Sequence, residues 1–235
     1  MRRKTQNKRI PLKNGFSNQK NEGFYEKMYG GEEKMSEEIS LKDCHKVTLE
    51  ELEEIAADAR GIVNKVYAHW TAGHYGQAFN SYHILIDEKG NAYITTEDFT
   101  EKLAHTWRRN SQAIGVSMMC AYKAEARNGR NCWLGYEPPT SIQITALSQV
   151  AAVLSKALGI PLDKEHFMTH CEAAILDGYG VPHGEVVNGV YQGDPDRRWD
   201  LWYLPDPNNN GVMTDGGQLW RGMANWYKNE WEKEE

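Results

Sequence analysis

Three side chains that together could bind one metal ion stand at separate places in the sequence. His69 lies in the string AHWTAG, His170 in MTHCEA, and Asp194 in GDPDRRWDLW. Two imidazoles and one carboxylate leave a fourth coordination position for water, which is the ligand set of a catalytic zinc ion. These three residues are therefore candidates for a single catalytic zinc centre.

Strands and helices must bring these residues together. The hydrophobic pattern predicts strands over 62–70, 81–87, 92–96, 113–122 and 167–170, and helices over 48–60, 140–158 and about 218–231. His69 then stands at the end of the first strand and His170 at the end of the last one. Strands that alternate with helices, together with one hairpin, indicate an α/β fold with a central mixed β-sheet flanked by helices.

Several short motifs follow one another in the order found in one enzyme family. They are His69-Trp70-Thr71-Ala72-Gly73, the strand 81–86 with its Gly90 turn, His105 followed by the block 110–116 (NSQAIGV), His170, and Asp194-Pro195-x-x-x-Trp199-Asp200. In this order they resemble the type 2 N-acetylmuramoyl-L-alanine amidases, which share a fold with peptidoglycan recognition proteins and phage lysozyme-amidases. The resemblance covers about residues 47–204 and implies a single amidase domain there.

The resemblance implies a function as well as a fold. It implies that His69, His170 and Asp194 bind zinc, and that the enzyme cleaves the amide bond between N-acetylmuramic acid and L-alanine in peptidoglycan. Tyr82 matches a tyrosine near the metal, where its phenol could orient the water or donate a hydrogen bond to the oxyanion. Packing of Tyr82 in a groove is the alternative.

Other residues of these motifs are candidates for binding the substrate. They are Trp70, Thr71, His74, His105 and Asn110. Aromatic faces suit sugar rings, and amides suit the stem peptide. For Trp70, packing in the core is at least as good an interpretation.

The sequence departs from the family pattern at two positions. Gln192 stands where many members carry a lysine, so a hydrogen bond without a charge would face the oxyanion. Ser117 stands where some members carry a glutamate. Glu172, two residues after His170, is a candidate substitute base or partner of a ligand, with a surface carboxylate as the equal alternative.

The third ligand is the least certain member of the zinc centre. Asp194 is favoured because Pro195 and the Trp199-Asp200 spacing match the family motif. Asp200 is expected to pair with Arg197 or Arg198 instead. The other nearby competitors are Asp196, His183 and Cys171.

The charge of the chain is unevenly distributed. Residues 1–20 carry seven basic and no acidic side chains, which leaves −13 for the other 215 residues of a chain whose net charge is −6. An acidic body argues against nucleic acid as the main ligand. We expect residues 1–46 to form a polar arm, either simply solvated or acting as an electrostatic tether to an anionic surface.

Further features concern location and accessory sites. No run approaches 18 uncharged apolar residues, so no membrane span is expected. No apolar segment follows the basic start, so we expect synthesis without a Sec signal. The four cysteines, Cys44, Cys120, Cys132 and Cys171, are expected to be reduced, although a Cys120–Cys132 bridge stays open.

Residues 205–235 are expected to form a loop and a Trp-rich amphipathic helix that packs on the domain. Leu219, Met223, Trp226, Tyr227 and Trp231 share one predicted face of that helix. Within the loop, Asp206 to Asp215 resembles half of a calcium loop, but glycine replaces the bidentate glutamate, so calcium is not expected.

Three functions fit these features. The first is a zinc amidase, expected as a monomer, that resembles a phage or prophage endolysin released to the cell wall through a holin; a muropeptide-recycling amidase of the cytoplasm is the alternative setting. The second is a peptidoglycan-binding module without hydrolysis. The third is a regulator that uses the basic arm and the Trp-rich helix to contact a protein.

Overall fold

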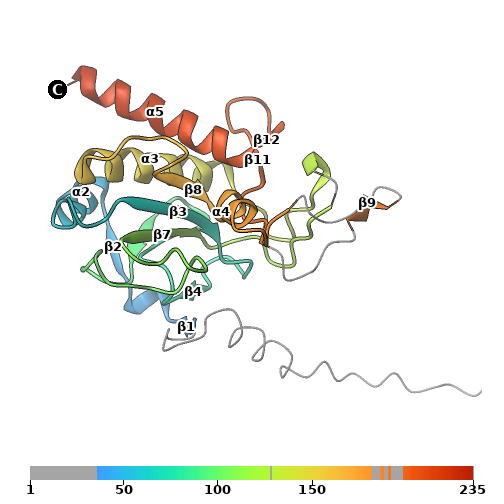
Figure 1. Ribbon diagram of the computed structural model, residues 1–235, viewed down its shortest axis with the longest axis horizontal. Coiled ribbons are helices and arrows are strands. Elements are labelled where there is room, and N and C mark those ends of the chain that lie inside the picture. The colour runs from blue at the N-terminus through green and yellow to red at the C-terminus, as the bar shows by residue number, and fades with distance from the viewer. Residues whose placement is uncertain (1–35, 128, 182–185, 188–189, 192–197, 235) are drawn as a thin grey trace, which may run out of the picture. The chain divides into compact units, whose positions relative to one another are not determined.

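A six-stranded mixed sheet forms the centre of the protein (Figure 1). The computed structural model describes residues 36–127, 129–181, 186–187, 190–191 and 198–234. The strands lie in the order β2 (His45–Val47), β6 (Ala92–Ile94), β5 (Ile84–Ile86), β7 (Ala113–Met118), β3 (Lys65–Trp70) and β8 (Phe167–Thr169). Neighbours are parallel from β5 to β8 and antiparallel from β5 to β2. The predicted α/β fold with a mixed sheet is confirmed.

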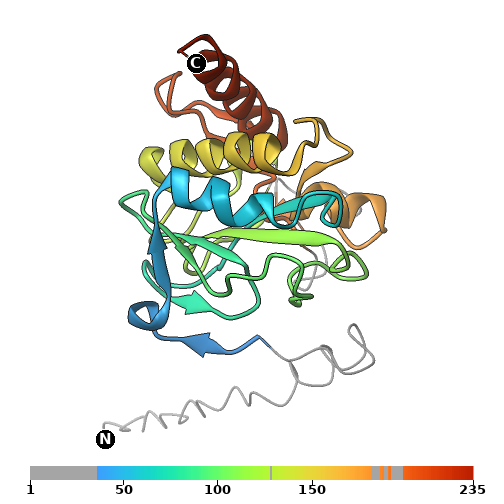
Figure 2. The same ribbon diagram turned by 90° about the vertical axis from the view of Figure 1, so that its left-hand side faces the viewer.

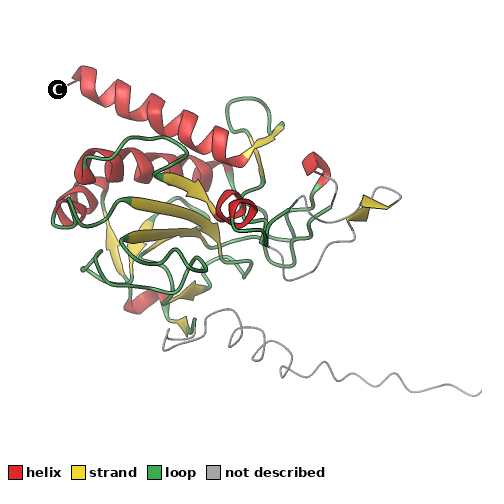
Figure 3. Cartoon of the chain, in the orientation of Figure 1, coloured by secondary structure: helices red, strands yellow, loops and turns green. Residues whose placement is uncertain are grey.

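Helices cover one face of this sheet. They are α2 (Leu49–Ala57), α3 (Ser141–Leu158) and α5 (Gly216–Glu234), while the short α4 (His170–Leu176) follows β8 directly. Figure 2 shows α5 stacked on α3. Helix α5 also contacts the sheet directly, since the ring of Trp220 meets that of Phe167 in β8. In Figure 3 the long helices α3 and α5 lie on one side of the central strands.

The remaining short elements lie outside the six-stranded sheet. β1 (Glu38–Ile39) pairs with β4 (Ala78–Phe79), β9 (Val186–Val187) with β10 (Val190–Tyr191), and β11 (Tyr203–Pro205) with β12 (Met213–Asp215). Two 3-10 helices, η1 (Leu41–Asp43) and η2 (Gly129–Asn131), complete the described elements.

Strand β3 separates the core from the candidate site. Because side chains alternate along a strand, Ala68 and Trp70 point to one face and Tyr67 and His69 to the other. Ala68 and Trp70 belong to the main hydrophobic cluster with the buried residues of α2, α3 and α5. His69 is fully buried on the opposite face. The helices therefore stabilise one face of β3, and the metal candidates occupy the other.

Local sequence explains where the predicted helices begin and end. Thr48 and Thr140 each open a helix with a complete capping box. Gly159 ends α3 in the left-handed conformation that glycine adopts without steric cost. Both predicted helices are confirmed.

Helix α3 also bears on the question of a membrane span. Among the described residues, this helix alone is long and apolar enough to cross a membrane by length and composition. Polar residues interrupt its apolar ones, so the sequence contains no uninterrupted apolar run here. The share of this stretch that is buried inside the fold is 72%, which matches its place in the core.

The predicted boundary of the N-terminal arm is wrong for its last residues. His45 to Val47 pair with β6 in the central sheet, and Glu38 and Ile39 pair with β4. Residues 36–46 are therefore part of the folded domain rather than of an arm. The basic residues 1–20 lie outside the described residues.

Helix α5 packs on the domain through most of the predicted face, since Leu219 and Met223 belong to the main hydrophobic cluster and Tyr227 and Trp231 pack against it. Trp220 is fully buried and donates its indole N–H to the carbonyl of Leu147, 3.1 Å away. Trp226, which was expected on the packing face, is 57% exposed. Trp220 and Ala224, one helical turn apart, mark the inner line of the helix.

The calcium-like string and the cysteines have structural explanations. Asp206 opens the turn of the β11–β12 hairpin, where its carboxylate accepts the N–H of Asn208 at 2.8 Å. Asp215 accepts the N–H of Gln218 at 2.9 Å at the start of α5. All four cysteines are free thiols, so Cys120 and Cys132 form no bridge.

Candidate metal centre and active site

Two histidines and one aspartate converge at the end of strand β3. Nδ1 of His69 lies 3.0 Å from Nδ1 of His170. Oδ2 of Asp200 lies 3.7 Å from the first nitrogen and 3.4 Å from the second. All three ligand atoms lie within 4.8 Å of one another. His69 and His170 are thus brought together as predicted.

The third member of this cluster differs from the prediction. Asp194 and Gln192 lie outside the described residues, and so do His183 and Asp196. Asp200, which was expected to pair with Arg197 or Arg198, faces the two imidazoles. Among the described residues, Asp200 therefore replaces Asp194 as the candidate third ligand.

The chain around His170 folds differently from the expected strand. β8 ends at Thr169, and His170 is the first residue of α4. Thr169 and Glu172 form a capping box, which starts the helix at this point. The N–H of Cys171 donates to the carbonyl of Asp200 at 3.2 Å. This backbone contact holds Asp200 beside the first turn of α4.

The buried setting alters the charge states of the cluster. Burial lowers the pKa of His69 to about 4, with the neighbouring His170 acting in the same direction. Burial raises the pKa of Asp200, but the imidazoles of His170 and His69 outweigh it and hold the pKa well below the ordinary range. A neutral imidazole and an ionised carboxylate are the forms that bind a metal.

A hydroxyl group contacts His69 from behind. Oγ1 of Thr106 lies 3.2 Å from Nε2 of His69 and 2.9 Å from Nδ1 of His105. The backbone N–H groups of His105 and Thr106 both donate to Oδ1 of Asn110, at 3.1 and 2.7 Å. Asn110 is 2% exposed and His105 is 4% exposed. Both predicted substrate-binding residues are therefore buried groups that position Thr106 against His69.

Gly115 gives His105 its place against strand β7. A Cβ atom on Gly115 would lie 2.6 Å from Cγ of His105. His83 fixes the same region, since its Nδ1 accepts the N–H of Gly115 and its Nε2 donates to the carbonyl of Glu101. Burial lowers the pKa of His83 to about 4. His83 is thus a neutral structural histidine.

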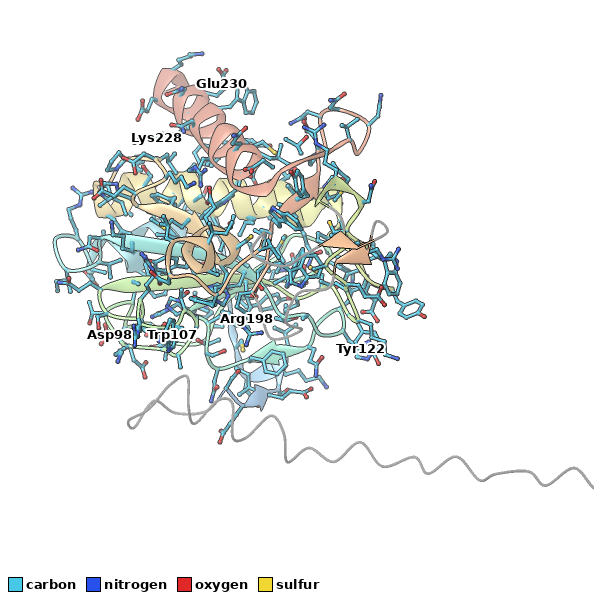
Figure 4. The ribbon with its side chains drawn as sticks, turned by 45° about the vertical axis from the view of Figure 1, so that its right-hand side comes forward. Asp98, Trp107, Tyr122, Arg198, Lys228 and Glu230 are labelled. Atoms are coloured by element: carbon cyan, nitrogen blue, oxygen red, sulfur yellow. The ribbon has the colours of Figure 1, made fainter. Side chains whose placement is uncertain are left out.

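Two tyrosines stand next to the ligand histidines. The ring of Tyr82 lies 5.1 Å from the ring of His69, as expected for a tyrosine near the metal. The hydroxyl of Tyr179 lies 3.4 Å from Nε2 of His170, and its ring meets Trp107 edge to face. Figure 4 shows Trp107 and Arg198 on the side of the sheet away from α5.

The other predicted substrate-binding residues differ in exposure. Trp70 is 3% exposed and packs edge to face on Trp199, so its core interpretation is the correct one. Thr71 is half-buried and accepts the N–H of Gly73. His74 is exposed and stacks on Tyr122 with ring centres 3.7 Å apart. Its Nδ1 lies 2.6 Å from Oε1 of Glu137.

Glu172 does not face the metal candidates. Its two carboxylate oxygens accept hydrogen bonds from Nη1 and Nη2 of Arg221, at 2.7 and 2.8 Å. The same arginine donates to the carbonyl of Phe167. Glu172 joins α4 to α5, so the contacts described for it favour neither a substitute base or partner of a metal ligand nor a surface carboxylate.

The donor set fits a zinc ion. Bonds of about 2.0–2.1 Å in a tetrahedral arrangement separate two nitrogen ligands by roughly 3.3 Å, close to the 3.0 Å between the two Nδ1 atoms. An ionised carboxylate completes the set. His69, His170 and Asp200 could therefore hold zinc with a fourth position left for water.

The sequence carried signals for some of the residues that were missed. Asp200 belongs to the Trp199-Asp200 pair, but only the folded chain shows that it reaches His69. Thr106 directly follows His105 and was not among the predicted site residues, although its hydroxyl contacts His69. Nothing in the sequence indicated that the hydroxyl of Tyr179 lies beside Nε2 of His170.

Comparisons with known proteins are consistent with this site. The profile of the family described as N-acetylmuramoyl-L-alanine amidase matches residues 55–187, which is more than half of the chain. The match includes His69, Tyr82, His105 and His170. No curated protein matches the chain.

Solved structures with some similarity exist. The endolysin N-acetylmuramoyl-L-alanine amidase LysCS from Clostridium intestinale is 18% identical, with 46% of this chain and 68% of that chain covered and a TM-score of 0.32. A peptidoglycan recognition protein, PGRP-Hd from Alvinella pompejana, is 12% identical, with 73% and 89% covered and the same TM-score of 0.32. On the extent of the profile match, the chain belongs to the N-acetylmuramoyl-L-alanine amidase family.

Proposed function

We propose that the protein is a zinc-dependent amidase that hydrolyses the bond between N-acetylmuramic acid and L-alanine in bacterial peptidoglycan. The observation that carries this proposal is the convergence of His69 Nδ1, His170 Nδ1 and Asp200 Oδ2 at one buried point. Family membership supports the reaction and the class of substrate.

Four residues of the chain have separate roles at the candidate zinc centre. Bound zinc would lower the pKa of a water molecule toward ~7 and polarise the scissile carbonyl. His69, His170 and Asp200 would hold the ion, and Asp200 would contribute a negative charge. The hydroxyl oxygen of Thr106 would accept a hydrogen bond from the Nε2–H of His69, which leaves Nδ1 free for the metal.

Tyr82 is proposed to act on the substrate directly. Its ring stands 5.1 Å from that of His69, and a phenol can donate a hydrogen bond to the oxygen that becomes charged in the transition state. Gln192 is proposed as a second, neutral donor in place of a lysine. Tyr82→Phe should then lower kcat with little effect on KM.

We further propose that the enzyme is an endolysin-type lytic amidase that acts on intact cell wall. The same site chemistry would serve an amidase that recycles soluble muropeptides, so the substrate form is the discriminating variable. Faster turnover of purified sacculi than of soluble anhydro-muropeptides supports the endolysin setting, and the reverse order supports recycling.

Release of free stem peptides from purified peptidoglycan, followed by mass spectrometry, tests the reaction. The zinc-loaded protein should release them, and a chelator, His69→Ala and Asp200→Asn should each abolish release. Asp194→Asn serves as the matched control and should retain activity. Tight binding of muropeptides without any release would contradict hydrolysis and favour a peptidoglycan-binding module.

A further inference from the structure

A groove of about 630 Å³ lies between helix α5 and the β11–β12 hairpin. This volume falls within the range of about 300–1,000 Å³ that is typical of small-molecule sites. Four polar side chains line it, from the hairpin and from the start of α5. They are Asp206, Asn208, Thr214 and Gln218. No lysine or arginine is among the described residues that line the groove.

One wall of the groove is aromatic. Trp226 lines it with 57% of its surface exposed, and Tyr227 meets the indole edge to face at 4.9 Å. On the same helix, Trp220 is fully buried in the core. Trp226 therefore contributes little to packing and presents a large ring to whatever enters the groove.

The floor of the groove contains a glycine that packing does not require. Gly222 lies inside α5, and a Cβ atom there would meet nothing within 4 Å. By contrast, a Cβ on Gly216 would strike the carbonyl of Leu201, and one on Gly217 would strike the carboxylate of Glu172. A glycine inside a helix lowers stability by about 0.5–1 kcal/mol relative to alanine. Packing does not explain why glycine stands at position 222, since an alanine would fit there. Gly222 leaves open space one turn before Trp226.

We propose that this groove binds an N-acetylated amino-sugar chain. A sugar presents apolar ring faces that stack on an indole, and hydroxyl and amide groups that hydrogen-bond to carboxylate, amide and hydroxyl side chains. The absence of a cation from the lining disfavours phosphate and other anions. The polar rim disfavours a lipid tail.

The groove is separate from the metal centre. Leu219 and Met223, which line it, belong to the same hydrophobic cluster as Ala68 and Trp70, whereas His69 points to the other face of β3. In Figure 4, Lys228 and Glu230 on α5 lie on the opposite side of the sheet from Trp107 and Arg198. If the proposed amidase function holds, on which the identity of the natural glycan rests, the groove is a second anchoring point along the same polymer.

Titration of the full-length protein with tetra-N-acetylchitotetraose, followed by tryptophan fluorescence and calorimetry, tests the proposal. The wild-type protein should bind, and Trp226→Ala and Gly222→Leu should each weaken the affinity roughly tenfold or more, as expected for loss of a central aromatic contact or for a blocked floor. Gly222→Ala should bind within about twofold of the wild type and melt at a slightly higher temperature. Ile62→Ala, which removes another exposed apolar side chain, is the matched control and should bind normally.

A second readout separates this site from the active site. Trp226→Ala should bind sacculi more weakly but release stem peptide from soluble muropeptides at the wild-type rate. Trp226-dependent sugar binding by a protein without amidase activity would support the groove while contradicting the proposed function. Equal sugar affinity of wild type and Trp226→Ala, no binding at all, or a dimer that Trp226→Ala dissociates would overturn the proposal.

Discussion

Oγ1 of Thr106 lies 3.2 Å from Nε2 of His69, on the side of the imidazole ring away from His170. A metal ion on Nδ1 requires the proton to be on Nε2, and the hydroxyl of Thr106 is placed to accept a hydrogen bond from that N–H. The hydroxyl of a loop residue therefore favours the tautomer of His69 that can bind a metal through Nδ1.

Thr106→Val should weaken zinc binding roughly 10- to 100-fold, because it keeps the shape of the side chain but removes the partner of His69. Thr106→Ser keeps the hydroxyl and should bind zinc nearly as well as the wild type. Competition with a chromophoric chelator measures both. Equal affinities of the valine and serine variants would show that the hydroxyl has no such role.

Gly115→Ala should displace His105, whose ring contacts the hydroxyl of Thr106. The new Cβ would lie 2.6 Å from Cγ of His105, so the ring must move, and the cost of overpacking is roughly 1–3 kcal/mol. Urea unfolding and zinc affinity should both decline. Gly222→Ala, which adds the same methyl group in open space, is the control and should lower neither quantity.

Glu172→Gln should destabilise the protein by about 3–5 kcal/mol, because it leaves the guanidinium of Arg221 without its charge partner in a largely buried place. The side chains of the pair are 13% and 11% exposed. Glu230→Gln breaks an exposed pair with Lys233 and should change stability by less than ~1 kcal/mol. Urea unfolding checks both.

The same Glu172→Gln protein also tests a functional role. Since Glu172 faces Arg221 rather than the metal candidates, the folded variant should release stem peptide at the wild-type rate per molecule. A loss of activity larger than the loss of folded protein would return Glu172 to the catalytic site.

Stability of the metal-free protein should fall as the pH falls from about 6.5 to about 4. Burial lowers the pKa of His83 to about 4 in the folded state, although a hydrogen bond to the Glu101 carbonyl opposes the shift. The unfolded chain then takes up protons first, so stability is complete above about 6.5 and is lost down to about 4, at a cost of roughly 3 kcal/mol.

Variants assign that pH dependence to its source. His83→Gln should flatten the slope of unfolding free energy against pH, whereas His45→Gln, whose side chain is 54% exposed, should leave the slope as it is. His69 contributes in the same direction as His83, so the comparison is between variants. Identical slopes for wild type and His83→Gln would contradict the assignment.

Local chemistry made much of the fold predictable. Capping boxes at Thr48 and Thr140 and the glycine after α3 specify their helices within the sequence itself. The prediction of His170 on a strand is wrong, because the capping box of Thr169 and Glu172 starts α4 at this residue. The predicted packing face of α5 is confirmed at Leu219, Met223, Tyr227 and Trp231. It is wrong at Trp226, which is exposed, and it omitted Trp220, which is fully buried.

The site was predictable only where local order suffices. His69 and His170 stand in recognisable strings, but Asp200 reaches them through the packing of a distant loop against α4. Strand alternation alone could have shown that Trp70 and His69 face opposite sides of the sheet. The burial of His105 and Asn110, by contrast, depends on tertiary contacts such as the space left by Gly115.

Anomalous diffraction at the zinc absorption edge tests the central claim most directly. We expect one strong peak bonded to Nδ1 of His69, Nδ1 of His170 and a carboxylate oxygen of Asp200, at distances of about 2.0–2.2 Å. A peak bonded to Asp194 with Asp200 turned away, or no peak at this position in zinc-soaked crystals, would contradict it.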